Sequence, residues 1–188
     1  MVDPNEDPVE LVAGRHEEWR VAFAAERERI RDALAAGGLD DRIRRTEHVG
    51  STAVPGLAAK DIVDLDVVVD DGAVADVSRT IVTDLGGTRS TNSDRWHPVF
   101  REHDGQRFND HVFGISARKW RVSVATRDVL RARADLREEY ERVKRDLAAE
   151  HDDLTAYSRG KTEFVERLLW VAREHDELTF GFTVPEGP

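Results

Sequence analysis

The chain has 188 residues, no cysteine and a formal net charge of −10, with 38 acidic residues against 28 basic ones. This length predicts one main domain with a buried core, and without cysteine there is no disulfide framework, thiolate metal site or cysteine nucleophile. No apolar run reaches the roughly 18 residues of a membrane-spanning helix, and the N-terminus lacks the basic and apolar regions of a signal peptide. We therefore expect a cytoplasmic protein with no membrane partner.

The charged residues also bear on habitat and partners, because only four of the 28 basic residues are lysine. An acidic surface poor in lysine suits a halophilic cytoplasm, where ions screen the repulsion; a GC-rich genome produces the same bias. A negative chain is a poor match for a broad nucleic-acid surface, which must neutralise phosphates. A small basic pocket for one nucleotide is compatible with it.

In the N-terminal half, the first prediction is a flexible acidic arm over residues 1–12, which carries two prolines. Apolar residues at near-helical spacing predict a helix over 14–36. A short β-like run precedes Gly50, the β-branched residues 62–69 predict a strand, and a helix over 72–85 follows.

In the C-terminal half, two strands over 97–101 and 106–115 are joined at Asp104-Gly105, a dipeptide suited to a tight hairpin turn. Two helices are predicted over 127–150 and 158–178. The tail after them either packs through its two phenylalanines or frays. The order predicts a single α/β (α+β) domain over residues 13–180, with a tail over 181–188.

Asp64 and Asp66 are the first candidates for chemistry. Side chains two apart on a strand project from the same face, so both carboxylates point into one site. They repel each other unless a cation lies between them. Mg²⁺ is a natural partner, since it takes one or two protein carboxylates together with phosphate oxygens.

A possible phosphate site lies upstream of this pair. Gly50 lets a phosphate approach the backbone, Ser51 or Thr52 supplies a hydroxyl, and Lys60 supplies a point charge. Each feature alone has an ordinary explanation: Asp-x-Asp is common at strand ends, and Lys60 is by default a surface lysine. Their combination, with twelve residues between Gly50-Ser51 and Asp64, is more specific.

The segment EHVGSTAVPGLAAKDIVDLDVVV resembles the hallmark of the GrpB family, which is placed in the DNA polymerase beta-like nucleotidyltransferase superfamily. Further similarity lies in the N-terminal helix and in later blocks, and spans about residues 15 to 170. The matching positions are Trp19, Phe23, 127–131, Tyr140 with Lys144, and Tyr157 with Lys161.

The resemblance implies a nucleotidyltransferase-like mixed sheet flanked by helices, with a C-terminal helical pair. It also implies transfer of a nucleoside monophosphate from a nucleoside triphosphate to an acceptor, here most simply a small molecule. Mg²⁺ (or Mn²⁺) would bind Asp64 and Asp66. Gly50 and Ser51 would hold the departing phosphates, with Lys60 or Arg101 adding positive charge.

Two positions depart from the family pattern. Asp61 replaces a proline and adds an acid near the proposed phosphate site. The usual His-x-His becomes Asn109-Asp110-His111, in which Asn109 and His111 share one strand face and Asp110 lies on the other. His111 is then a metal ligand, an acid/base group for the acceptor, or a structural histidine.

Other hallmark residues leave alternatives open. His48 either orients the Gly-Ser loop or contacts substrate, or else is a strand residue bonded to a nearby carbonyl. Tyr140 with Lys144 and Tyr157 with Lys161 are spaced i, i+4 and share helix faces. A core tyrosine with a solvated lysine is the default interpretation of each pair.

Three functions compete at this stage. The first is the nucleotidyltransferase, and the second is a non-catalytic nucleotide- or anion-binding module that retains the fold. The third is phosphate-ester hydrolysis at the same carboxylates. A serine hydrolase is unattractive because Ser51 lacks the Gly-x-Ser-x-Gly context of a nucleophile elbow.

Overall fold

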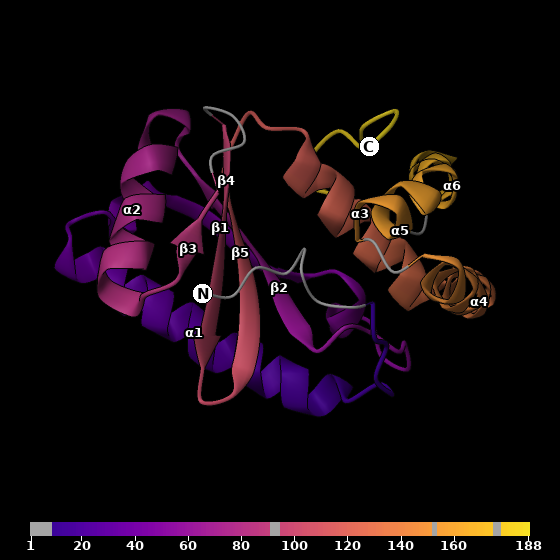
Figure 1. Cartoon of the computed structure of the whole chain (residues 1–188). Coiled ribbons are helices and arrows are strands. Elements are labelled where there is room, and N and C mark those ends of the chain that lie inside the picture. Colours follow the sequence, from indigo (N-terminus) through magenta and orange to yellow (C-terminus); the bar gives the residue numbers. More distant parts are fainter. Residues whose placement is uncertain (1–8, 91–94, 152–153, 175–177) are drawn as a thin grey trace.

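The protein is described by a computed structural model that covers residues 9–90, 95–151, 154–174 and 178–188 (Figure 1). Its centre is a five-stranded sheet in the order β1-β2-β5-β4-β3. β2 and β5 are parallel, and the other neighbours are antiparallel. The strands are β1 (Ile43–Val49), β2 (Ile62–Val69), β3 (Thr88–Arg89), β4 (Trp96–His103) and β5 (Gln106–Gly114). The predicted mixed sheet is confirmed.

Side chains alternate between the two faces of the sheet along β2, and this alternation decides which residues face the core. Its β-branched residues favour an extended backbone. Val63, Leu65, Val67 and Val69 point to one face and are fully buried in the largest apolar cluster. The intervening positions, with both aspartates of the strand, point to the opposite face.

Two helices cover the first face of the sheet, α1 (His16–Ala36) and α2 (Val74–Leu85). The predicted helix over 14–36 therefore begins two residues later than expected. Trp19, Ile30 and Leu34 of α1 pack against the β2 valines. Three short 3-10 helices complete this half: η1 (Asp40–Arg42), η2 (Ser51–Ala53) and η3 (Asp71–Ala73).

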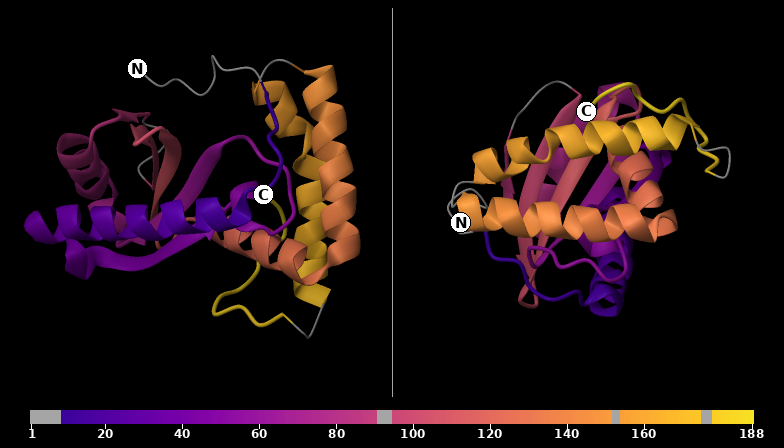
Figure 2. Two further views of the ribbon diagram at one scale, coloured as in Figure 1. Left: turned by 90° about the horizontal axis from the view of Figure 1, so that it is seen from below. Right: turned by 90° about the vertical axis from the view of Figure 1, so that its right-hand side faces the viewer.

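The C-terminal helices lie on the second face (Figure 2). They are α3 (Lys119–Ala132), α4 (Ala134–Glu150), α5 (Leu154–Gly160) and α6 (Thr162–Glu174). Each of the two predicted helices is thus divided, the first at Arg133, whose backbone is extended (φ −112, ψ 99). The predicted end of the second falls at residues 175–178, of which 175–177 lie outside the described residues.

Both ends of the described chain are attached to this framework. The predicted arm is described only from residue 9 onward, where the backbone of Val12 pairs with that of Ala59. The tail packs rather than frays, with the Phe182 ring 5.0 Å from that of Trp120. Within the described ranges, no helix has both the length and the apolar character needed to cross a membrane.

Candidate functional site

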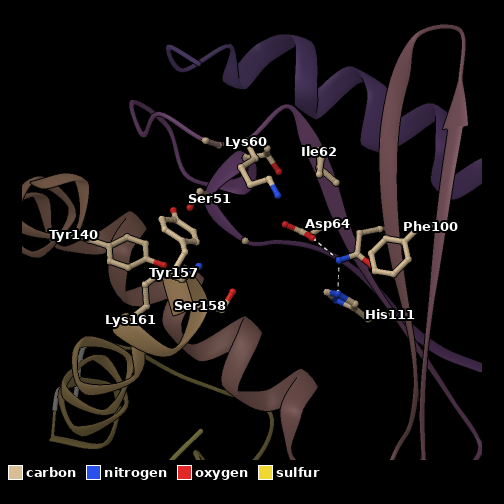
Figure 3. A pocket seen from close by; sticks show the side chains of 14 residues that line it. Ser51, Lys60, Ile62, Asp64, Phe100, His111, Tyr140, Tyr157, Ser158 and Lys161 are labelled. Atoms are coloured by element: carbon tan, nitrogen blue, oxygen red, sulfur yellow. Dashed lines mark hydrogen bonds between the residues drawn. The ribbon is translucent and has the colours of Figure 1, made fainter. Parts of the chain in front are cut away.

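A cavity of about 370 Å³ opens between the second face of the sheet and the C-terminal helices (Figure 3). One wall comes from the η2 turn and strands β2, β4 and β5, and the other from α4, α5 and the residue that precedes α6. Its polar lining includes Gly50, Ser51, Thr52, Lys60, Asp64, Asn109, His111, Tyr140, Tyr157, Ser158 and Lys161. The structure therefore brings six of the nine predicted site residues together in one cavity, namely Gly50, Ser51, Thr52, Lys60, Asp64 and His111.

Gly50 is needed because its backbone passes against the Asp64 carboxylate. Its φ is +69°, a left-handed conformation that L side chains rarely adopt. A Cβ at this position would lie 2.5 Å from Asp64 Oδ2. The glycine of the Gly-Ser motif thus leaves room for the carboxylate and sets the entry to η2.

The carboxylates of β2 are joined to β5 by a chain of hydrogen bonds. Asn109 Nδ2 donates to Asp64 Oδ1 at 3.0 Å and lies 2.7 Å from His111 Nε2. With Nε2 as the acceptor, His111 Nδ1 carries the proton and donates to Asp66 Oδ1 at 3.0 Å. The pairing of β2 with β5 confirms that Asn109 and His111 share a face and that Asp110 lies on the other.

Burial raises the pKa of Asp64 and of Asp66, and the nearby His111 offsets this only in part. Burial lowers the pKa of His111, but the Asp66 hydrogen bond and the surrounding carboxylates outweigh it and leave the pKa raised. A proton on Nε2 requires the Asn109 amide to turn its Oδ1 toward the ring. That oxygen is buried without a partner among the described residues, so the amide can respond to the histidine.

Two lysines bring positive charge to the same cavity. Lys60 enters from the segment before β2, and Lys161 enters from the helical side, with its Nζ 4.3 Å from the centre of the Tyr157 ring. Burial lowers the pKa of Lys161 to about 8, partly countered by the charge of Asp64. Figure 3 shows both lysines directed toward the space beside Asp64.

Lys144 is not the solvated lysine that its helical spacing predicts. Its side chain is 1% exposed, and its Nζ donates to Ser51 Oγ at 3.3 Å and to the Ala58 carbonyl. Burial lowers its pKa to about 8, against the opposing effect of Glu141. The i, i+4 spacing of Tyr140 and Lys144 was the one sequence feature that indicated this position, because both side chains face residues 51–58.

His48 supports the η2 turn from behind and does not line the cavity. Its ring stacks on Phe23 at 4.8 Å, and its Nε2 lies 3.0 Å from Thr52 Oγ1. Burial, together with the charges of Arg131, His16 and Arg127, lowers its pKa to about 3. Of the alternatives, the geometry fits a neutral histidine that orients the loop.

Arg101 is the predicted phosphate contact that the structure contradicts. It faces α1, on the side of the sheet away from the cavity, and its side chain is 1% exposed. Its guanidinium donates to Asp110 Oδ2 at 2.6 Å and to Glu26 Oε1 at 2.6 Å. The two-residue turn pairs Arg101 with Phe108, so its strand parity excludes it from the face that carries His111.

Asp61 lies near the predicted phosphate segment but is directed away from the cavity. It accepts hydrogen bonds from Trp19 Nε1 at 2.9 Å and from Arg15. Burial raises its pKa, but these two donors outweigh the effect and leave the pKa lowered. The acid that replaces the family proline therefore adds no uncompensated charge to the site.

The carboxylates fit a divalent cation on two observations. Both have raised pKa values when no cation is present, and Asp66 Oδ2 is buried with no hydrogen-bond partner among the described residues. Across the described part of the chain, no three His, Cys, Asp or Glu side chains are grouped to hold a metal ion. A divalent cation held by Asp64 and Asp66 would take its remaining ligands from water or phosphate, as Mg²⁺ commonly does.

Fold and cavity define a mixed α/β protein with a polar site between its sheet and its C-terminal helices. A family model described as GrpB protein matches residues 8–170. A UPF0157 protein of Halalkalibacterium halodurans is 37% identical over 157 residues, which cover 80% of this chain and 76% of that protein. The chain belongs to the GrpB family.

A solved structure of a GrpB protein agrees with this assignment at the level of the fold. The crystal structure of conserved protein GrpB from Enterococcus faecalis has a TM-score of 0.73 at 22% identity, covering 87% of this chain and 96% of that one. A cytoplasmic RNA terminal U-transferase is only weakly similar, with a TM-score of 0.43 at 14% identity over 92% of this chain and 53% of that one.

Proposed function

We propose that the protein is a Mg²⁺- or Mn²⁺-dependent nucleotidyltransferase of the DNA polymerase beta-like superfamily. It transfers a nucleoside monophosphate from a nucleoside triphosphate to a small-molecule acceptor. The observation that carries the proposal is that Asp64, the Gly50-Ser51 turn, Lys60 and Lys161 meet in one cavity. A volume of about 370 Å³ lies in the range of small-ligand pockets, roughly 300–1,000 Å³.

Asp64 and Asp66 would hold the metal, which when bound neutralises charge on the phosphates. Ser51 binds phosphate oxygens through its hydroxyl, beside the backbone that Gly50 leaves open. Lys60 and Lys161 place positive charge where the leaving pyrophosphate gains negative charge, so they favour the transition state over the bound substrate.

The acceptor hydroxyl or amine attacks the α-phosphorus as the bond to pyrophosphate breaks. His111 lies on the β5 side of Asp64, away from the two tyrosines of the helical wall (Figure 3), and Asn109 lies on the same face of β5, within 2.7 Å of it. In this proposal they orient the acceptor, and His111, held by Asp66, receives its proton. The small volume of the cavity and a net charge of −10 favour a small acceptor over a nucleic acid.

The test is isothermal titration with each nucleoside triphosphate, with and without Mg²⁺ or Mn²⁺, at low and at multimolar KCl. Wild type is compared with Asp64→Asn/Asp66→Asn. Asp61→Asn is the matched control, since this acid lies nearby but outside the cavity. Metal-dependent binding that the double variant loses and the control keeps supports the proposal. No binding of any triphosphate at either salt concentration overturns it.

A non-catalytic nucleotide- or anion-binding module is the second candidate, and one observation favours it. Of the two aspartates only Asp64 lines the cavity, while one oxygen of Asp66 is engaged by His111. This candidate predicts binding that needs no metal and survives the double substitution. Metal-dependent release of pyrophosphate in the presence of an acceptor pool distinguishes the enzyme from the module.

A further inference from the structure

Lys144 contacts the site segment from α4, about ninety residues later in the chain. Its ammonium has three protons and no lone pair. Three acceptors face it: Ser51 Oγ at 3.3 Å, the Ala58 carbonyl, and Glu141 Oε2 at 3.5 Å. These three acceptors account for all three protons of the ammonium, so Lys144 donates to Ser51 and cannot accept from it.

The Ser51 hydroxyl has one proton to donate and two positions at which to accept. Lys144 occupies one accepting position. Tyr140 lines the same cavity, and burial raises its pKa, so its phenol stays protonated beside Ser51. Because the Lys144 ammonium can only donate, the proton of Ser51 is left for the cavity that this residue lines.

The same side of α4 also holds the far end of the segment. Ala58 N donates to Glu141 Oε2 at 3.0 Å, while its carbonyl accepts from Lys144. Glu141 is held in turn by Arg145 at 2.7 Å. Residues 51–58 are thus fixed at both ends by one turn of α4, two residues before Lys60.

We propose that Lys144 is a positioning residue that makes Ser51 a hydrogen-bond donor toward the ligand. Ser51 then offers its proton to an anionic oxygen of the ligand, such as one of a phosphate. The inference rests on the proposed function for the identity of the ligand, a nucleoside triphosphate. The role of Lys144 in fixing the segment stands on the contacts alone.

A double-mutant cycle with Ser51→Ala and Lys144→Met tests this role through triphosphate affinity. A hydrogen bond to a charged group is worth enough to change affinity about tenfold or more. Because Lys144 acts through Ser51, we expect each single variant to lose about tenfold and the double variant to lose no more than either. Losses that multiply would show that Lys144 acts independently of Ser51 and would overturn the proposal.

Controls separate positioning from folding. Lys119→Met removes a lysine that lies over the Trp96 ring outside the cavity, and should leave affinity unchanged. Urea unfolding of each variant checks that affinity is compared between folded proteins. If Lys144→Met does not fold, Lys144→Gln takes its place in the same cycle, since its shorter amide keeps a polar group near Ala58.

The outcomes also separate this inference from the proposed function. If wild type binds no triphosphate, the proposed function fails, and amide exchange then decides the role of Lys144. Lys144→Met should accelerate exchange at Ala53, Val54 and Leu57, whose N–H groups close the turns of the segment. Ser51→Ala should not. Unchanged exchange in Lys144→Met would overturn the positioning role.

Discussion

Each face of the sheet carries a network of buried carboxylates and basic side chains, but only one of the two networks borders a cavity. Asp110 and His111 are neighbours on β5 but face away from each other. On the α1 side, Asp110, Arg101 and Glu26 are buried together, and Arg29 adds a second guanidinium 2.7 Å from Glu26. On the other side, Asp64 borders an open cavity that Lys60 and Lys161 also line.

This difference shows what marks a ligand site in this fold. An unpartnered carboxylate oxygen occurs on both faces, at Asp110 and at Asp66, so it is not sufficient by itself. What distinguishes the second face is the space beside Asp64, which the ammonium groups of Lys60 and Lys161 also border. The first network stabilises the fold, and the second has room for another molecule.

Breaking the closed network should have the largest effect on stability. Arg101→Met leaves Glu26 and Asp110 buried with less positive charge, and losing one partner of a buried pair costs about 3–5 kcal/mol. We expect a loss of that size in urea unfolding, with ligand affinity of the folded fraction unchanged. Arg44→Met, at an exposed pair with Asp70, should cost far less, because water and salt screen exposed pairs. Equal losses in the two variants would contradict the comparison.

Gly50→Ala should act on the open face instead. Its Cβ would meet Asp64 Oδ2, so we expect triphosphate affinity to fall at least about tenfold, while backbone strain costs about 1–3 kcal/mol. Gly56→Ala is the matched control, because Gly56 also has positive φ but nothing within 4 Å of the added atom. Titration and unfolding of both variants check this. Similar affinities would show that contact with Asp64 does not matter.

The charge of the cavity should make anion binding depend on pH. Burial lowers the pKa of Lys161 to about 8, so its charge is present below that pH and lost above it. We expect affinity for a triphosphate to fall severalfold between pH 7 and pH 9. Lys161→Met should bind more weakly and show a shallower change, the remainder coming from Lys144. A wild-type profile that is flat over this range would contradict the assignment.

The smallest effect should be a gain in stability at Asp64. Because burial raises its pKa, the stability that Asp64 contributes is present below pH 3.8 and is lost as pH rises through its higher folded value. Without metal, Asp64→Asn should therefore be more stable than wild type at pH 7, by about 1 kcal/mol.

Asp61→Asn should change the stability of the protein in the opposite direction to Asp64→Asn. Trp19 and Arg15 outweigh burial and lower the pKa of Asp61, so its contribution is present above pH 3.8 and lost as pH falls. This variant should be less stable than wild type at pH 7. Unfolding curves between pH 4 and pH 8 measure both, and a loss in Asp64→Asn would contradict the expected cost of its burial.

Local periodicity predicted the strand that carries Asp64 and Asp66, and its register with β5 confirms that Asn109 shares their face. The division of the C-terminal helices was not predicted, because Arg133 leaves the helical region without a proline or glycine to signal it. The sequence contained enough information to predict that Arg101 faces away from the cavity. A two-residue turn at Asp104-Gly105 fixes the parity of β4 against β5.

The burial of Lys144 could not be predicted from the local sequence pattern. The pattern of α4 shows which residues share a helix face, but not that this face packs onto the segment of Ser51 and Ala58. That contact joins residues more than eighty positions apart. Sequence motifs identified the sheet side of the cavity well, whereas its helical side depends on long-range packing.

The placement of the lysines means that the cavity can be labelled selectively by an amine-reactive reagent. Of the four in the chain, Lys60 and Lys161 line it and Lys144 is buried behind it. Lys119 is the one lysine that is exposed outside it. A small reagent that acylates amines therefore has few other side chains to modify, and the rest of the cationic surface, built from arginine, is inert to it. The mass increment of two peptides would then report occupancy of the cavity directly, whatever molecule fills it.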